Sequence, residues 1–233
     1  MKQRSLLPEL MDDPSLDAVA LQQALDEVTL VNRILGGNQV TTRGLDYFFK
    51  KFPQDQYVIA DMGCGDGATL RTVASYCRKK DISVNLLGYD LNPKSIALAR
   101  EKSADYPEIQ FEVQDILKLD THSFSCDIIL SVLTMHHFTN AEIDKFLNQF
   151  LQLARLGVVI NDLQRNRLAY VLFKAFSRVF MRSYIARYDG LISIKRAFTK
   201  KELVTFTKKL PVNRYQLSWC WAFRYLWILE KQH

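Results

Sequence analysis

The sequence predicts an α/β protein built around a mostly parallel sheet. Short apolar runs rich in Val, Ile and Leu alternate with amphipathic helical segments along the chain. Apolar runs of this kind, without polar alternation, are typical of parallel strands that are buried on both faces. The 233 residues are enough to bury a sizeable core in one large domain or in a domain with an appended cap.

The first 40 residues are predicted to form an N-terminal helical cap. Asp13-Pro14 is expected to open a helix with one apolar side, and Gly36-Gly37 to stop it. Residues 41–233 would then form the main domain.

Five strands are predicted, each an apolar run that ends at a glycine or a polar residue: 58–62, 86–90, 111–116, 127–133 and 156–160. Helices are expected between them. Asn92 is a capping residue followed by proline at the first helical position, and Thr139 with Glu142 matches a capping box.

Residues 163–198 are predicted to form a helical lid inserted after the fifth strand. About 35 residues separate that strand from a helix capped by Thr199, a length that usually indicates a functional insertion. The basic character of the chain also lies here, since residues 163–214 contain 13 Lys or Arg and two acids, a net charge of +11 against +6 for the whole chain. An amphipathic helix is predicted within this insertion. Its basic residues recur at every fourth position and form a cationic stripe: Lys174, Arg178 and Arg182. The stripe fits a solvated edge, a lid over an apolar substrate, a dock for an anionic membrane surface or a contact for an acidic partner such as an acyl carrier protein.

A glycine-rich loop follows the first strand and contains Asp61, Gly63, Gly65, Asp66 and Gly67. Glycines let backbone N–H groups approach a ligand closely. The loop also fits a loose dinucleotide pattern, but two carboxylates would repel a pyrophosphate and would favour an ammonium or a sulfonium. Asp90, at the end of the second strand, can accept hydrogen bonds from both hydroxyls of a ribose.

The loop, these acids and the fourth strand together resemble the class I S-adenosylmethionine-dependent methyltransferases over residues 40–233. The resemblance implies a Rossmann-like sheet of seven mostly parallel strands with an antiparallel edge hairpin at 215–230. It implies S-adenosyl-L-methionine as cofactor and S-adenosyl-L-homocysteine as product. The cofactor residues that it indicates are Asp61, Gly63, Gly65 and Gly67 at the methionine end, Asp90 with Leu91 at the ribose, Asp115 with Ile116 at the adenine, and Ser131 in the fourth strand.

Two adjacent histidines follow the fourth strand and are the candidate catalytic residues. Ligands of open α/β sheets bind beyond the carboxyl ends of the strands, and a histidine can remove a proton near neutral pH. We favour His137 as the base with His136 second, while a structural role for either stays open. No metal site is predicted because no third ligand has suitable spacing.

Arg33, Asp162 and Arg165 are the candidate substrate residues. Asp162 could orient an acceptor or cap the helix after it. The segments that contain these residues, with Leu10–Pro14 and Arg196–Thr199, look like those of small bacterial methyltransferases of aromatic polyketide and quinone-type biosynthesis. That finer resemblance implies methylation of an oxygen, or less readily a carbon, of a small hydrophobic aromatic acceptor.

Three other functions stay open: an RNA methyltransferase, a non-catalytic module that binds the cofactor and a partner, and a nicotinamide enzyme. Nucleic acid is disfavoured because Phe, Leu and Val are interleaved with the basic residues of the insertion. No apolar run approaches the roughly 20 residues needed to cross a bilayer, and the first residues lack the apolar core of a signal peptide. Four scattered cysteines without a C-x-x-C pair fit reduced thiols, so the expected location is cytoplasmic.

Overall fold

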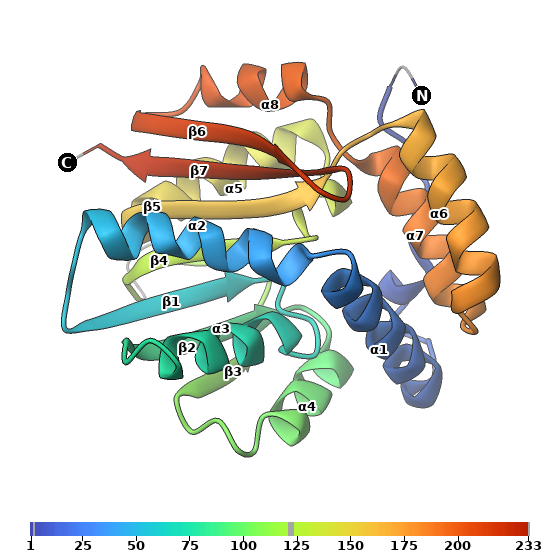
Figure 1. Ribbon diagram of the computed structural model, residues 1–233, viewed down its shortest axis with the longest axis horizontal. Coiled ribbons are helices and arrows are strands. Elements are labelled where there is room, and N and C mark those ends of the chain that lie inside the picture. The colour runs from blue at the N-terminus through green and yellow to red at the C-terminus, as the bar shows by residue number, and fades with distance from the viewer. Residues whose placement is uncertain (2, 121–123, 233) are drawn as a thin grey trace.

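The computed structural model describes residues 1, 3–120 and 124–232, which form a sheet of seven strands in the order β3-β2-β1-β4-β5-β7-β6 (Figure 1). The strands are β1 Gln56–Met62, β2 Ser83–Asp90, β3 Ile109–Val113, β4 Cys126–Val132, β5 Ala154–Leu163, β6 Val212–Cys220 and β7 Arg224–Lys231. The first five pair in parallel, and β7 is antiparallel to both β5 and β6. The predicted sheet and its antiparallel edge hairpin are confirmed.

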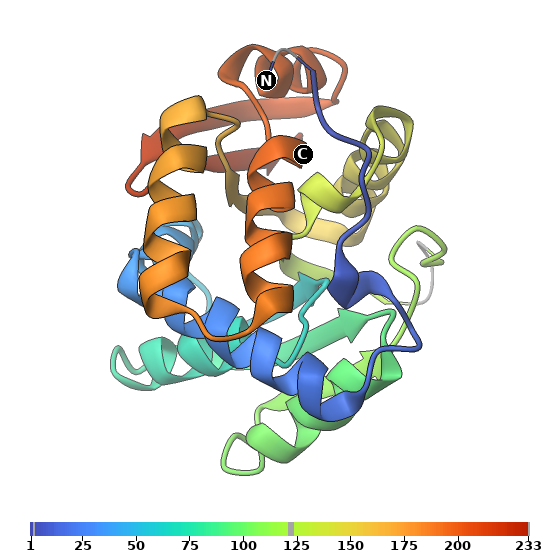
Figure 2. The same cartoon turned by 90° about the vertical axis from the view of Figure 1, so that its right-hand side faces the viewer.

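Helices cover both faces of this sheet and a third group lies beyond one end of it (Figures 1 and 2). The covering helices are α2 Gly37–Lys51, α3 Ala68–Arg78, α4 Pro93–Lys102, α5 Asn140–Leu153 and α8 Lys200–Thr207. The third group is α1 Ala18–Ile34, α6 Arg167–Phe180 and α7 Tyr184–Arg196, with the 3₁₀ turns η1 Leu10–Asp12 and η2 Met135–His137. This group stands at the carboxyl ends of the parallel strands, where an open α/β sheet binds its ligands.

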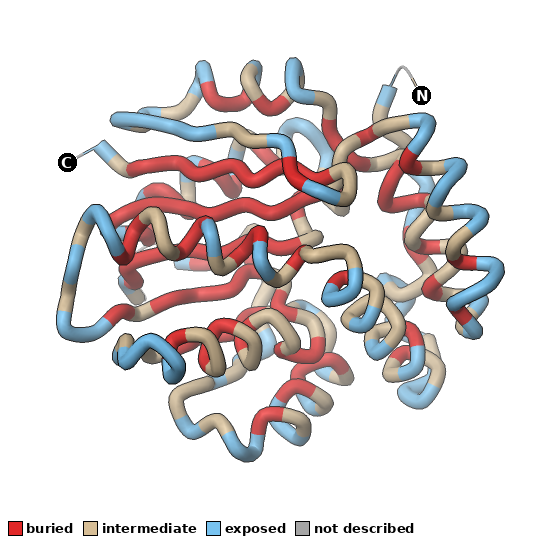
Figure 3. The backbone as a smooth tube through the Cα atoms, viewed as in Figure 1, coloured by how far each residue is buried: buried red, intermediate tan, exposed pale blue. Residues whose placement is uncertain are grey.

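Two apolar cores sandwich the sheet, which explains why its central strands have no polar alternation. Successive side chains of a strand point to opposite faces, so Ile129 packs toward α5 and α8 while Ile128 and Leu130 pack toward α2 and α3. All seven residues of β4 are buried, whereas the edge strand β3 is largely exposed. Figure 3 shows that buried residues gather in the central strands, while exposed residues lie on the outer sides of the helices.

The helix caps predicted from the sequence are present. The Asn92 side chain accepts a hydrogen bond from the Lys94 N–H at 2.9 Å, and Pro93 occupies the first helical position. Thr139 with Glu142 and Thr199 with Glu202 form reciprocal capping boxes.

The N-terminal helix differs from the prediction. Asp17, and not Asp13, caps α1, because its carboxylate accepts from the N–H groups of Val19 and Ala20, while Asp13 bonds Ser15. Gly36 adopts a left-handed φ of 79° and ends α1 as expected, but α2 begins at the next residue. The boundary predicted at residues 40 and 41 therefore falls inside α2.

Two strand ends also differ from the prediction. Strand β3 ends at Val113, so Asp115 and Ile116 lie in the loop beyond it. Strand β5 continues to Leu163, so Asp162 is a strand residue and does not cap a helix; Asn166 caps α6 instead. Among the described residues, no helix has the length and apolar character needed to cross a bilayer.

Candidate active site

A cavity of about 1050 Å³ lies between the carboxyl ends of the parallel strands and the third group of helices. The loops after β1, β2, β3 and β4 form its floor, and Figure 2 looks onto the helices that cover it. Its walls come from η1, α1, α6, α7 and the turn between β6 and β7. The cavity therefore occupies the place that the sheet topology assigns to a ligand.

The glycine-rich loop turns sharply at the start of this cavity. Gly63, Gly65 and Gly67 all have a positive φ, of 82°, 54° and 77°, which side chains with a Cβ rarely adopt. Gly63 and Gly65 line the cavity. Gly67 does not, and a Cβ there would meet the Phe111 ring at 2.6 Å, so this glycine serves the packing of α3.

Asp90 lines the cavity at the end of β2 and is tied to the loop. Its Oδ2 accepts a hydrogen bond from the Gly65 N–H at 2.9 Å, and its Oδ1 accepts one from the Asn92 N–H at 2.9 Å. Leu91 beside it is exposed toward the same space, and Asp115 and Ile116 lie on the cavity wall. The structure therefore brings together six of the nine predicted cofactor residues: Gly63, Gly65, Asp90, Leu91, Asp115 and Ile116.

Asp61 and Ser131 lie beneath the loop and do not line the cavity. Both are almost fully buried, and Asp61 Oδ1 and Ser131 Oγ have no hydrogen-bond partner among the described residues. Burial, with the nearby Asp90 carboxylate, raises the pKa of Asp61 to about 8. Asp61 is thus an unpartnered acid directly below the glycines.

The second carboxylate of the loop has a different role. Asp66 pairs with Lys102 at 2.8 Å and with Arg71 at 3.5 Å, so its charge is compensated within the protein. Of the two loop acids whose charge we expected to select a cationic ligand, only Asp61 remains without a partner. Cys64 between them is buried, and burial raises the pKa of its thiol, which fits a small packed residue.

Leu133 turns the chain from β4 into η2, with a positive φ of 56° that is unusual for a leucine. The turn presents both histidines at the cavity. His136 is buried, whereas the side chain of His137 is 26 % exposed. Their rings lie with centroids 4.5 Å apart and are tilted by 34°.

His136 is held on both sides by carboxylates. Its Nδ1 lies 2.7 Å from Asp162 Oδ1, its backbone N–H donates to Asp162 Oδ2, and its Nε2 lies 3.5 Å from Glu9 Oε1. Burial alone would lower the pKa of this imidazole, but Asp162 and Glu9 raise it to about 10. The two carboxylates therefore favour a positive charge at this buried ring.

His137 is held by the N-terminal segment. Its Nδ1 lies 3.1 Å from Asp12 Oδ2 and its Nε2 lies 3.7 Å from Glu9 Oε2. Sequence reasoning missed Glu9, which lies 127 residues before the histidines and has no motif of its own. The buried Asp189 of α7 fixes this segment, since it accepts hydrogen bonds from the N–H groups of Leu10 and Met11.

The three predicted substrate residues do not line the cavity. Arg33 is exposed on α1. Arg165 is buried and donates to the Ala197 carbonyl and to Glu202, so a structural ion pair occupies its guanidinium. Asp162 acts through His136. The assignment of these residues to the acceptor stays a prediction, and none of the three side chains lines this cavity.

The cavity also has an apolar wall. The side chains that form it come from α6 and from the turn between β6 and β7: Leu172, Phe173, Phe176, Trp221 and Phe223. The cavity thus combines polar groups at the strand termini, apolar side chains of α6 and of the β6–β7 turn, and the histidine pair with Glu9.

Residues 59–157 match the model of a methyltransferase domain family, Methyltransf_25. This range runs from β1 to β5 and contains the glycine loop, Asp90 and the histidine pair. Residues 59–157 are therefore a methyltransferase domain. The resemblance inferred from the sequence is confirmed.

Curated relatives of this methyltransferase include a tRNA (carboxymethyluridine(34)-5-O)-methyltransferase, ALKBH8, from Mus musculus, which is 28% identical over 160 residues. The match covers 66% of this chain and 21% of the relative. The same protein of Macaca fascicularis is 27% identical over 145 residues, and the match covers 60% of this chain and 19% of that relative. The chain spans about a fifth of the length of these relatives.

Solved structures with the same fold include the plantazolicin methyltransferase BpumL in complex with SAH, at a TM-score of 0.69 and 15% identity, with 91% of this chain and 90% of that one covered. The CurJ carbon methyltransferase matches at a TM-score of 0.68 and 13% identity, with 94% of this chain and 62% of that one covered. Magnesium protoporphyrin IX methyltransferase from Synechocystis PCC 6803 with bound SAH matches at a TM-score of 0.58 and 14% identity, with 84% of each chain covered. At these identities the likeness shows the fold.

Proposed function

We propose that this methyltransferase transfers the methyl group of S-adenosylmethionine to an oxygen of a small hydrophobic aromatic, polyketide or quinone-like acceptor. The observation that carries the proposal is that one cavity is lined both by polar groups of the loops after β1 and β2 and by aromatic side chains of α6. The first suits the cofactor and the second an apolar acceptor.

The residues at the strand termini fit the cofactor. The unpartnered carboxyl group of Asp61 lies beneath the loop, where binding of the ammonium and sulfonium groups would favour its ionised form. Asp90, on the cavity wall, suits a ribose, while Leu91 and Ile116 offer apolar contact to an adenine. When bound, S-adenosylmethionine supplies a methyl group that is open to in-line attack. The protein then has to align the acceptor and exclude water.

The histidine cluster favours an oxygen acceptor. A hydroxyl that is methylated loses its proton, and His137 is the more accessible imidazole at the cavity. His136 is paired with carboxylates on both sides, so we assign it a positioning role. A carbon acceptor remains the alternative within the same class of small molecules.

The test is calorimetric titration of the purified protein with S-adenosylmethionine, S-adenosylhomocysteine and NADH in parallel. Micromolar binding of the first two alone supports the proposal, and labelled methyl transfer to a set of phenols and hydroxyquinones then identifies the acceptor. Binding of NADH alone, or of none of the three, would overturn it in favour of a nicotinamide enzyme or a partner-binding module.

RNA is the second candidate acceptor. It is favoured by the similarity to tRNA methyltransferases and by the net charge of +11 over residues 163–214. An RNA methyltransferase would bind tRNA with an affinity that falls steeply with salt. Labelled methyl transfer to total tRNA, with no transfer to phenols, would replace the small-molecule proposal.

Helix α6 offers a surface for an anionic membrane, from which an apolar acceptor could reach the cavity. Its exposed apolar residues share one side of the helix: Leu168, Val171, Leu172, Ala175 and Val179. Arg167, Lys174 and Arg178 lie beside them, and Leu172 also lines the cavity. An exposed apolar stripe with a cationic edge is the pattern of a helix that lies in a membrane interface. We place the protein in the cytoplasm with α6 on that surface, and an acyl carrier protein is the alternative partner.

A further inference from the structure

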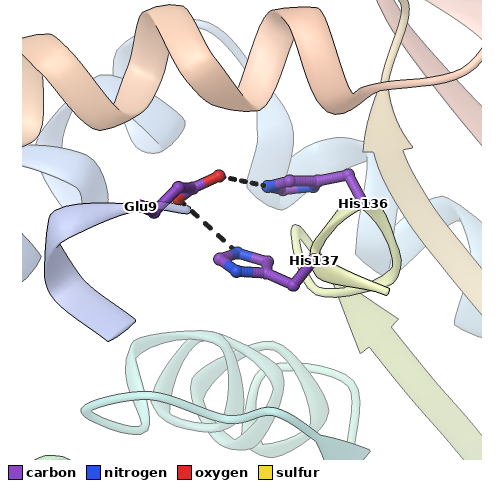
Figure 4. A group of neighbouring side chains, drawn as sticks. All are labelled: Glu9, His136 and His137. Carbon is purple, nitrogen blue, oxygen red and sulfur yellow. Dashed lines mark ion pairs between the residues drawn. The ribbon is translucent and has the colours of Figure 1, made fainter. Parts of the chain in front are cut away.

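Glu9, His136 and His137 converge from two distant parts of the chain on one point at the cavity wall (Figure 4). His136 Nε2 lies 3.5 Å from Glu9 Oε1, and His137 Nε2 lies 3.7 Å from Glu9 Oε2. Each oxygen of one carboxylate thus faces a different imidazole. One potential ligand atom from each residue lies within 4.8 Å of the other two.

These separations are close to those of a coordination sphere. Nitrogen and oxygen ligands bind Zn²⁺ at about 2.0–2.2 Å, so neighbouring ligand atoms lie roughly 3 to 3.5 Å apart. Small rotations of the two rings and the carboxylate would bring all three onto one ion. The donor set is two imidazoles and one carboxylate, which suits a divalent transition-metal ion with open positions.

The other nitrogen of each ring is arranged as in a metal ligand. His136 Nδ1 lies 2.7 Å from Asp162 and His137 Nδ1 lies 3.1 Å from Asp12. A histidine that binds a metal almost always donates its second N–H to a carboxylate or carbonyl, which fixes the tautomer and the ring orientation. Both rings therefore have a carboxylate at Nδ1 and direct Nε2 toward Glu9. Ser193 holds Glu9 in turn, since its hydroxyl donates to Glu9 Oε1 at 2.8 Å.

An ion pair with His136 alone does not account for the cluster. His136 Nε2 is buried, and among the described residues it has no hydrogen-bond partner. The nearby guanidinium groups do not contact Glu9 either. Those of Arg4 and Arg196 donate to backbone carbonyls, including the carbonyl of His136. The carboxylates of Glu9, Asp12 and Asp162 all face the two rings, so a metal ion between the rings would replace a proton that these carboxylates favour there.

We propose that Glu9, His136 and His137 bind one divalent transition-metal ion at the acceptor end of the cavity. The open positions of the ion face the cavity, where they could hold an acceptor oxygen; this use of the site rests on the function proposed above. In the metal-bound state His137 is a ligand, and the ion takes over the activation of the acceptor that we assign to His137 in the metal-free state. Because Glu9 precedes η1, the ion would also fasten the N-terminal segment over the cavity.

The experiment is Co²⁺ titration of protein that carries no histidine tag and has been freed of metal with a chelator. One equivalent of Co²⁺ should produce visible absorption bands typical of nitrogen and oxygen ligands, and Zn²⁺ should displace it. Glu9→Gln should weaken Co²⁺ binding by about 100-fold or more, since it removes the anionic ligand. Asp13→Asn is the matched control, because it removes an acid four residues away that contacts Ser15, and it should leave Co²⁺ binding unchanged.

Two measurements keep the outcome clear if a variant is less stable. Circular dichroism reports whether Glu9→Gln is folded, and His137→Ala, at the more exposed ring, tests the same site independently. No stoichiometric Co²⁺ binding to the wild type, or binding that both variants retain, would overturn the site. Titration with S-adenosylmethionine separates this failure from that of the proposed function, because cofactor binding does not require Glu9.

Discussion

Asp162, at the end of β5, holds His136 of the neighbouring turn through two contacts, one to the imidazole Nδ1 at 2.7 Å and one to the backbone N–H at 3.1 Å. Both side chains are almost fully buried. The pair therefore fixes the 3₁₀ turn that presents both histidines, and Asp162 serves the site without facing the cavity.

Replacement of Asp162 should be costly for the fold. Asp162→Ala removes the partner of the buried His136 Nδ1 and of the His136 backbone N–H, and breaking a buried pair in this way costs about 3–5 kcal/mol. We expect the free energy of unfolding of the metal-free protein, measured in urea, to fall by about 3 kcal/mol. Asp12→Ala is the control, because its carboxylate is 49 % exposed and its pair with His137 should contribute less than about 1 kcal/mol. Equal losses in the two variants would show that Asp162 is not the anchor of the turn.

The strands and caps could be predicted because their causes are local. Asn92 before proline and the two capping boxes are short patterns whose hydrogen bonds form within a few residues. The limit of local reasoning is visible at the N-terminus, where Asp13 and Asp17 both suit a cap. The choice of Asp17 depends on where α1 packs, which a short pattern does not contain.

The cluster around Glu9 could not be predicted from spacing. Glu9 reaches the histidines because Asp189 of α7 binds the N–H groups of Leu10 and Met11, a contact between segments about 180 residues apart. The position of Arg165 away from the cavity has a similar cause, because its partner Glu202 belongs to the distant helix α8. Both outcomes depend on tertiary packing of residues whose immediate neighbours give no signal.

Asp61 should lower the stability of the free protein at alkaline pH and should be required for binding of S-adenosylmethionine. A carboxyl whose pKa is raised to about 8 in the folded protein binds its proton more tightly than the unfolded chain does, where the pKa is 3.8. The stability that this proton provides is fully present below about pH 4 and is lost as the pH rises toward 8. Asp61→Asn should therefore raise the free energy of unfolding at pH 8 by an amount on the order of 1 to 3 kcal/mol, and have little effect near pH 4.

The same variant should bind S-adenosylmethionine poorly. A cationic ligand favours ionised Asp61, so the wild-type affinity should rise with pH between about 6 and 8, by up to tenfold per unit, and Asp61→Asn should remove that dependence. Thermal unfolding and calorimetry at the two pH values measure both effects. A loss of stability of the variant at pH 8 would show that Asp61 has a partner in the folded protein. Normal cofactor affinity of the variant would show that Asp61 does not contribute to cofactor binding.

Asp90 should be required for cofactor affinity more than for stability. Asp90→Ala removes the only carboxylate at the end of β2, together with the hydrogen bonds to Gly65 and Asn92. Hydrogen bonds to a charged group contribute about 1.5–3 kcal/mol, so S-adenosylmethionine should bind roughly 10- to 100-fold more weakly. Glu112→Ala, which removes an exposed acid from the neighbouring strand, should leave affinity unchanged. An unchanged affinity in Asp90→Ala would remove the ribose assignment.

Helix α6 should bind vesicles that contain phosphatidylserine and not vesicles of phosphatidylcholine alone. Each basic residue near an anionic surface contributes about 1 kcal/mol, so Lys174→Glu with Arg178→Glu should weaken binding by at least tenfold. Val179→Glu should weaken it as well, because Val179 is 75 % exposed and belongs to the apolar stripe that would enter the interface. Lys201→Glu reverses one positive charge on the exposed side of α8 and should have little effect. Co-sedimentation at low and high salt measures these differences. Vesicle binding that the three α6 substitutions leave intact would place the contact elsewhere. Tight binding to an acyl carrier protein without vesicle binding would assign the basic face of α6 to a protein partner.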